Sequence, residues 1–269
     1  MPRDILNGTV PVGGTEMCWA RFGHGAKTLV VLPGLGDGLA TVQGKALLLA
    51  GPYKPVFDDY TVYMFSRKNE MPQDYSIWDM AADQAAALQS LGIEKAAVLG
   101  VSQGGMIALA LALDHAELVE KLVLAVSAPC VNPLIRERVE GWIGFAKIGD
   151  HKGLMIDTAE HSYSPERLKK LRRAYHLFGV LGKPKDYDRF LINARAILAF
   201  DASERLACVS SPTLILGGEA DDIVGAQASR EMHEKIPGSE LYLWPGLGHA
   251  AYEEAKDFYD RVFKFLMEA

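Results

Sequence analysis

Short apolar segments that alternate with longer helical ones constrain the fold of this 269-residue chain more than any other feature. The apolar segments are hydrophobic on both faces, which is typical of parallel strands covered by helices on both sides. We therefore predict an α/β fold with a mostly parallel β-sheet flanked by helices. The predicted strands cover residues 27–32, 60–67, 95–100, 119–125, 212–218 and 239–244, and the predicted helices include residues 76–92, 103–113, 226–236 and 250–269.

Two parts of the chain depart from this alternation. Residues 9–23 contain two β-like segments around a Gly-Gly turn, which predicts an antiparallel hairpin. Residues 130–207 are charged and helical in pattern, too long for a loop and unlike a disordered linker in composition. We expect a core of residues 1–129 and 208–269 and a helical cap of residues 130–207.

Composition narrows the classes of function. The net charge of −6 argues against a nucleic-acid surface. The start of the chain has no apolar region of a secretory signal, and no apolar run is long enough to span a membrane. The three cysteines, Cys18, Cys130 and Cys208, form no CxxC pair, which favours reduced thiols in a cytoplasmic protein. The sequence leaves the oligomeric state open.

A serine stands among glycines where a predicted strand meets a predicted helix. The sequence "GVSQGG" covers residues 100–105, and this Gly-x-Ser-x-Gly pattern between strand and helix predicts a nucleophile elbow with Ser102 at its tip. The small neighbours allow strand and helix to approach closely. The side chain is expected at the carboxyl end of the sheet, where open α/β sheets carry their sites.

A serine nucleophile needs a base, and the base needs an orienting carboxylate. Of the seven histidines, His249 follows the strand at 239–244 and precedes the last helix, so we expect it at the same sheet edge as Ser102. Three carboxylates follow the strand at 212–218. Glu219, Asp221 and Asp222 are each candidates for the orienting acid, and helix capping is the competing explanation for them.

Oxyanion stabilisation requires backbone N–H donors near the serine. The glycine-rich loop "PGLGDG" at residues 33–38 ends a predicted strand on the same side of the sheet. It lacks the spacing of a dinucleotide-binding loop. The histidines and cysteines show no zinc-binding spacing, and we expect neither a metal nor a cofactor.

These four motifs together resemble the α/β-hydrolase superfamily, in particular its small capped esterase, lactonase and peptidase branch. In that family the cap enters between the sixth and seventh strands. The resemblance implies that Ser102 is the nucleophile, His249 the base and Asp221 the acid, the last because it stands three residues after Gly218. It also implies that the backbone N–H groups of Leu35 and Gln103 form the oxyanion hole, although Pro33 replaces the family's usual histidine.

The implied function is hydrolysis of a small carboxylic ester through an acyl-enzyme, with a small-molecule acyl compound as the partner. A lactonase, thioesterase, aminopeptidase or carbon–carbon bond hydrolase fits the same residues. A ligand-binding receptor or pseudoenzyme on this fold is the alternative outside enzymes. In the cap, Trp142, Phe145 and Tyr163 are candidates for lining the substrate pocket, although such residues also pack a cap onto its core.

Overall fold

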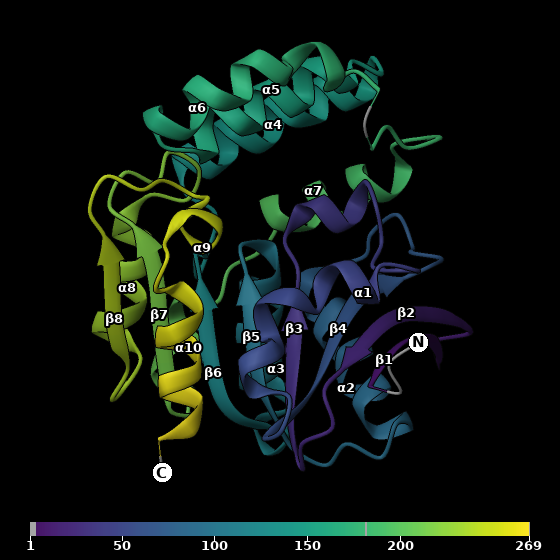
Figure 1. The fold of residues 1–269 in the computed structure, drawn as a ribbon, viewed down its shortest axis with the longest axis vertical. Helices are drawn as coiled ribbons and strands as arrows, with labels where there is room; N and C mark the ends of the chain where they lie inside the picture. Colours follow the sequence, from purple (N-terminus) through teal and green to yellow (C-terminus); the bar gives the residue numbers. More distant parts are fainter. Residues whose placement is uncertain (1–3, 181, 269) are drawn as a thin grey trace.

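The computed structural model describes residues 4–180 and 182–268, and eight strands within these residues form one sheet in the order β1-β2-β4-β3-β5-β6-β7-β8 (Figure 1). β1 pairs antiparallel with β2, and β2 pairs antiparallel with β4. From β4 onward, through β3 and β5 to β8, each strand runs parallel to the next one in the sheet. The predicted α/β fold with a mostly parallel sheet is confirmed. The strands are β1 Ile5–Val12, β2 Thr15–Phe22, β3 Lys27–Leu32, β4 Tyr60–Lys68, β5 Ala96–Val101, β6 Val119–Ala125, β7 Thr213–Gly218 and β8 Glu240–Trp244.

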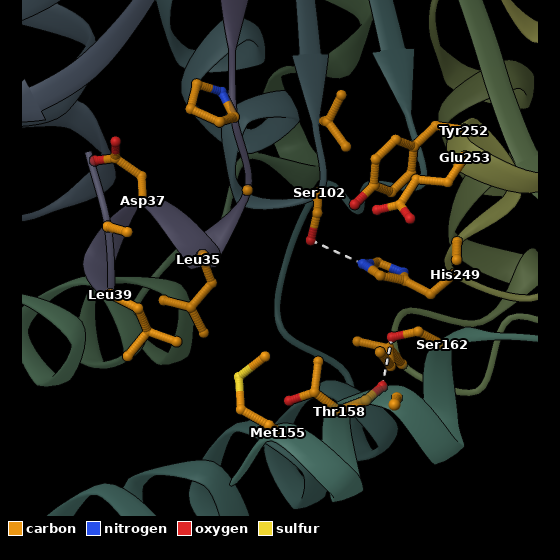
Figure 2. A pocket seen from close by; sticks show the side chains of 18 of the residues that line it. Leu35, Asp37, Leu39, Ser102, Met155, Thr158, Ser162, His249, Tyr252 and Glu253 are labelled. Atoms are coloured by element: carbon orange, nitrogen blue, oxygen red, sulfur yellow. Dashed lines mark hydrogen bonds between the residues drawn. The ribbon is translucent and has the colours of Figure 1, made fainter. Parts of the chain in front are cut away.

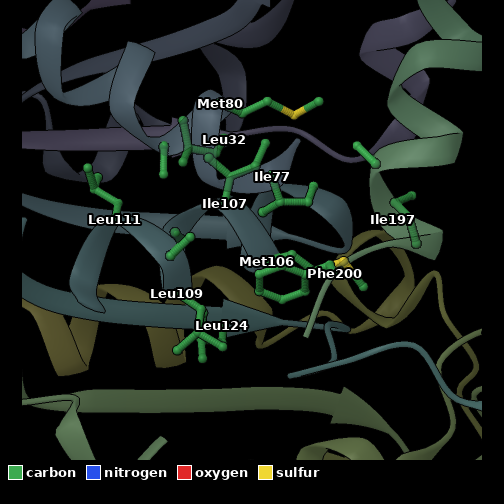
Figure 3. Close-up of a cluster of buried hydrophobic side chains, with 14 of the residues drawn as sticks. Leu32, Ile77, Met80, Met106, Ile107, Leu109, Leu111, Leu124, Ile197 and Phe200 are labelled. Carbon is green, nitrogen blue, oxygen red and sulfur yellow. The ribbon is translucent and has the colours of Figure 1, made fainter. Parts of the chain in front are cut away.

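Helices cover both faces of this sheet because its strands present apolar side chains to both sides. In β5, Val98 packs into one hydrophobic cluster while Ala97 and Leu99 pack into another, as the two-residue period of a strand requires. The first cluster includes side chains of α2 and α3 (Figure 3) and also of α8, and the second includes side chains of α1 and α10. The α-helices are α1 Ala46–Leu49, α2 Ile77–Ser90, α3 Gln103–Asp114, α4 Pro133–Lys147, α5 His151–Ser162, α6 Pro165–Leu171, α7 Asp188–Leu198, α8 Ala226–Lys235, α9 Ala251–Glu254 and α10 Phe258–Met267.

The two helices at the centre of the first cluster form for different local reasons. α2 begins after Ser76, the first residue of the predicted helix. Ser76 Oγ accepts a hydrogen bond from the Asp79 N–H at 3.1 Å, and Asp79 Oδ2 accepts one from the Ser76 N–H at 2.9 Å. α3 is buried from Gln103 to Ala112, so it needs no polar face. Its burial explains the alanine-rich sequence after Ser102.

The last predicted helix is interrupted, which corrects the expectation of one helix over residues 250–269. Ala255 adopts an extended conformation between α9 and α10. Asp257 then accepts hydrogen bonds from Trp244 Nε1 and Arg261 Nε, both at 2.7 Å. The break lets the apolar side of α10, including the fully buried Phe258, pack against the second cluster.

The stretch between β6 and β7 is helical and holds α4 to α7, and we call residues 130–207 the insertion. α4, α5 and α6 lie beyond the carboxyl ends of the parallel strands, whereas α7 lies closer to the sheet (Figure 1). α7 contacts α4 and the short 3-10 helix η1, Leu35–Gly38. The described part of the insertion contains no named strand, and a bridge between Cys130 and Asp201 joins its two ends. The division into a core and a separate cap stays a prediction.

Among the described residues, no helix combines the length and the apolar character that crossing a bilayer requires.

Candidate active site

Ser102 lies in a strained turn between β5 and α3. Its φ of 54° and ψ of −119° fall outside the regions that residues with a side chain ordinarily adopt. The Ser102 N–H donates to Ala125 O of β6 at 2.8 Å, and the Ser102 carbonyl accepts from Ser127 Oγ at 2.8 Å. The neighbouring strand therefore holds the turn in place while the side chain projects toward a cavity (Figure 2).

Glycine is required beside Ser102 because backbone segments touch there. A Cβ atom at Gly104 would lie 1.9 Å from the Leu32 carbonyl oxygen, and one at Gly100 would lie 2.3 Å from the Gly104 carbonyl oxygen. No side chain fits at such separations. The Gly-x-Ser-x-Gly pattern in the sequence therefore has a steric cause, because the turn between strand and helix leaves room only for glycine at these positions.

The structure brings His249 and Asp221 to Ser102. His249 Nε2 lies 2.9 Å from Ser102 Oγ, and His249 Nδ1 lies 2.8 Å from Asp221 Oδ2. Both the histidine and the aspartate are 8% exposed. An Nδ1–H that donates to the carboxylate leaves Nε2 free to accept the proton of the serine hydroxyl. The three side chains can therefore move a proton from Ser102 to His249 while Asp221 stabilises the resulting imidazolium.

Asp221 is held as a carboxylate. Burial by itself raises the pKa of Asp221, but His249 and the N–H groups of Ile223 and Val224 outweigh it, so this pKa lies below its usual value of 3.8. Both N–H groups donate to Asp221 Oδ1 at 2.9 Å. The remaining oxygen, Oδ2, is thereby left for the imidazole.

The loops that carry Asp221 and His249 are bonded to each other. The Ala220 N–H donates to Leu247 O at 2.9 Å, and the Ala250 N–H donates to Ser162 O, at the end of α5, also at 2.9 Å. A Cβ atom at Gly248 would lie 2.7 Å from Ser162 O, so the histidine loop passes directly under the insertion. These backbone contacts fix the position of His249 between Asp221 and Ser102.

The other two candidate acids point elsewhere. Asp222 accepts a hydrogen bond from Arg138 of α4 at 3.0 Å, and its side chain is 52% exposed. Glu219 pairs with Arg230 at 2.7 Å on the surface. Neither residue caps α8, whose N-cap is Gly225. The helix-capping explanation for these acids is therefore wrong.

Both predicted oxyanion donors open a helix near the serine. Leu35 begins η1 and Gln103 begins α3, and the first N–H groups of a helix have no acceptor within that helix. A Cβ atom at Gly34 would lie 3.3 Å from Ser102 Cβ, so the loop before Leu35 passes beside the serine. N–H groups at the starts of these two helices, beside Ser102, can stabilise a developing oxyanion.

A cavity of about 490 Å³ opens onto Ser102 and His249, and most of the side chains that line it are apolar. Trp142 and Tyr163 line this cavity, and their role in binding a substrate stays a prediction. Phe145 does not line the cavity, because it packs against Gly153 between α4 and α5 instead, which corrects that expectation. Other lining residues include Leu35, Met64, Met155, Phe178, Phe190, Ile223, Tyr252 and Glu253.

Tyr252 and Glu253, which were not predicted from the sequence, lie beside the serine and histidine in the cavity (Figure 2). Glu253 Oε2 accepts a hydrogen bond from the Tyr163 hydroxyl at 2.6 Å, so α9 and the insertion meet here. Both residues follow His249 within about one turn of helix. That closeness in sequence to His249 was the available signal.

Among the described residues, no group of three or more histidine, cysteine, aspartate or glutamate side chains is placed to hold a metal ion.

Comparison with known proteins places the chain in a family. The family model described as alpha/beta hydrolase fold matches residues 27–256. A protein of Klebsiella pneumoniae (strain 342) named "Putative carbamate hydrolase RutD" is 30% identical over 244 residues, which cover 88% of this chain and 90% of that protein.

Two solved structures illustrate the likeness in three dimensions. MGS-M2, an alpha/beta hydrolase from a Medee basin deep-sea metagenome library, matches with a TM-score of 0.87 at 20% identity, over 97% of this chain and 98% of that one. The enol-lactonase from Burkholderia xenovorans LB400 matches with a TM-score of 0.84 at 20% identity, over 97% and 100%. At these identities the likeness shows the fold. With the match over residues 27–256, it follows that the chain belongs to the alpha/beta hydrolase fold family and is a hydrolase.

Proposed function

We propose that this hydrolase cleaves a small carboxylic ester through an acyl-enzyme, with Ser102 as nucleophile, His249 as base and Asp221 as the orienting acid. The observation that carries the proposal is the continuous hydrogen-bonded chain from Asp221 Oδ2 through His249 to Ser102 Oγ, with contacts of 2.8 and 2.9 Å. An intact chain of this kind beside an apolar cavity supports turnover and disfavours a receptor that only binds.

The steps follow from the geometry. Ser102 Oγ attacks the carbonyl carbon as His249 Nε2 takes its proton, and the N–H groups of Leu35 and Gln103 bind the oxyanion. The tetrahedral intermediate collapses, the bond to the leaving group breaks, and His249 returns the proton to that group. Water then repeats the sequence on the acyl-enzyme and releases a carboxylic acid and free Ser102.

Carbamates are a second candidate substrate class. The support is the named carbamate hydrolase, which is 30% identical over 88% of this chain. A carbamate carbonyl is attacked in the same way as an ester carbonyl, so the serine, histidine and aspartate need no change of role. The cavity walls decide between the two classes.

A fluorophosphonate probe tests the nucleophile. We expect labelling of Ser102 in the wild-type protein and loss of labelling in Ser102→Ala. Ser162→Ala is the matched control, because Ser162 also lines the cavity but donates its hydroxyl to Thr158 O. Labelling that persists in Ser102→Ala, or an unlabelled wild type, contradicts the proposal.

A substrate panel then separates the classes. Matched aryl esters, carbamates, lactones, thioesters and amides should be compared by kcat/KM. Esters are expected to lead. A carbamate that exceeds its matched ester by tenfold or more would favour the second candidate.

A further inference from the structure

Two buried charged side chains lie next to the segments that carry the predicted oxyanion donors, Asp37 in η1 and Arg67 against Gln103. Asp37 is 3% exposed and Arg67 is 2% exposed. Asp37 Oδ2 accepts hydrogen bonds from the Arg67 N–H at 3.0 Å and from an Arg189 guanidinium nitrogen at 2.8 Å. Arg189 Nε also donates to the Asp37 carbonyl at 3.1 Å. Because Asp37 belongs to η1, these bonds hold the loop that Leu35 opens.

The same side chains hold the second donor. Arg67 donates to Gln103 Oε1 at 2.8 Å, and Gln103 Nε2 donates to the Asn193 carbonyl at 2.8 Å. Asn193 lies one turn after Arg189 on α7, and its Nδ2 donates to the Arg189 carbonyl at 2.8 Å. One cluster of buried and partly buried side chains therefore joins η1, which begins at Leu35, to Gln103 at the start of α3; its members are Asp37, Arg67, Gln103, Arg189 and Asn193.

Stability alone does not explain this cluster. Burying charges costs several kcal/mol per ion, so buried ion pairs add little net stability. Arg67 Nε and Asp37 Oδ1 also have no hydrogen-bond partner among the described residues. Burial lowers the pKa of Arg67 to about 10, although Asp37 opposes the shift, so the guanidinium stays charged at neutral pH. One carboxylate and two guanidinium groups leave a net charge of +1, which favours a nearby oxyanion.

We propose that Arg67 and Arg189 are positioning residues that hold the N–H groups of Leu35 and Gln103 where the oxyanion forms. α7 of the insertion thereby serves the chemistry as well as the cavity. This inference rests on the proposed serine mechanism. Its physical basis is that an oxyanion hole works only when its donors are fixed before the charge develops.

Arg189→Lys is the primary test, because lysine keeps the charge beside Asp37 but cannot form the four bonds that Arg189 makes to Asp37, Arg67 and Lys68. We expect kcat/KM for an activated ester to fall ten- to a hundredfold, on the order of the effect of a small misplacement of catalytic groups. Arg195→Lys is the matched control, since Arg195 is exposed on the same helix and contacts Gln73. It should retain full activity.

Inhibitor binding distinguishes positioning from general loosening. Phenylethylboronic acid forms a tetrahedral adduct with an active serine and fills the oxyanion hole, whereas phenylpropanamide occupies the cavity without that adduct. In Arg189→Lys the affinity for the boronic acid should fall by the same factor as kcat/KM, and the affinity for the amide should change less than twofold. Equal losses for both ligands, or an equal effect in Arg195→Lys, would overturn the proposal.

Gln103→Met provides a second route if Arg189→Lys does not fold. It removes both side-chain bonds of Gln103 but keeps the backbone N–H, and the same selective loss of boronic acid affinity is expected. An unchanged kcat/KM in folded Gln103→Met overturns this inference. If Ser102 of the wild type is still labelled by the fluorophosphonate, the proposed function is unaffected by that result. A wild type without labelling at Ser102 overturns both.

Discussion

At the scale of single residues, the chemistry depends on which of two adjacent aspartates faces the imidazole. Asp221 is buried and lies 2.8 Å from His249, whereas Asp222 is half exposed and binds Arg138 of α4. Consecutive loop residues point in different directions, so only one of them reaches His249. Asp222 instead links the loop to the insertion.

We predict that Asp221→Asn lowers kcat by about 10⁴-fold, the order of magnitude for loss of an orienting carboxylate. Asp222→Asn is the control and should keep kcat within a factor of a few, with a loss in the free energy of unfolding of at most about 1 kcal/mol for an exposed ion pair. Steady-state kinetics and denaturant unfolding of both variants provide the check. A large loss of kcat in Asp222→Asn, together with a nearly unchanged kcat in Asp221→Asn, would reverse the assignment of the acid.

The lowered pKa of Asp221 also predicts how stability depends on pH. Because the folded-state pKa lies below 3.8, the unfolded chain binds the proton more readily. The stabilisation is therefore complete above 3.8 and is lost as the pH falls through the folded-state pKa. Denaturant unfolding between pH 5 and pH 2 should show a shallower acid decline for Asp221→Asn than for the wild type. Parallel declines would show that this carboxylate is not stabilised in the folded protein.

At the scale of elements, the junction of β3, β5 and α3 tolerates no added atoms. A Cβ atom at Gly104 would meet the end of β3, whereas Gly144 lies exposed on α4, where a Cβ atom would have no neighbour within 4 Å. The same substitution should therefore have opposite effects at the two sites.

Gly104→Ala is expected to lower the free energy of unfolding by about 1–3 kcal/mol or more, because its Cβ would overlap Leu32 O. It should also lower kcat, since α3 begins at Gln103 and β3 leads into the loop of Leu35, the two proposed oxyanion donors. Gly144→Ala should raise the free energy of unfolding by about 0.4–1 kcal/mol through helix propensity and unfolded-state entropy. Thermal and denaturant unfolding measure both, and destabilisation of similar size at both positions would refute the packing argument.

At the scale of the whole molecule, the insertion lies over the carboxyl edge of the sheet (Figure 1). It also contributes walls to the cavity at Ser102. α4 and α5 contribute Trp142, Leu154 and Met155 to the walls. We propose that these helices select the acyl group, while α7 supports the oxyanion donors. The insertion then has two roles that its sequence alone does not separate.

Enlarging the wall tests the first role. Met155→Ala should shift the ratio of kcat/KM for a hexanoyl ester over an acetyl ester by about tenfold, which corresponds to about 1.4 kcal/mol of differential binding. The matched control is Ile148→Ala, because Ile148 is 78% exposed on the same insertion. Equal changes for both esters in Met155→Ala would show that this wall does not contact the acyl chain.

Features that depend on local spacing could be predicted from the order of the residues. Short runs that are apolar on both faces predicted strands buried between helices, and the helix predicted over residues 76–92 does begin with Ser76 as its cap. The glycines around Ser102 predicted the elbow, because backbone segments that approach this closely leave no room for a side chain. The break at Ala255 escaped this reasoning, since it depends on Trp244 holding Asp257 from another element.

Contacts between side chains that are distant in the sequence depend on how the whole chain folds. Ser102 and His249 stand 147 residues apart, and their contact depends on the backbone bonds between the loops after β7 and β8. Phe145 packs against Gly153 of α5 and is not among the residues that line the cavity, a pairing of helices that the sequence pattern did not specify. The cluster around Arg67 and Arg189 joins β4 to α7 across 122 residues. Buried polar contacts of this kind leave no local pattern, because each side chain is satisfied by partners that the fold brings from elsewhere.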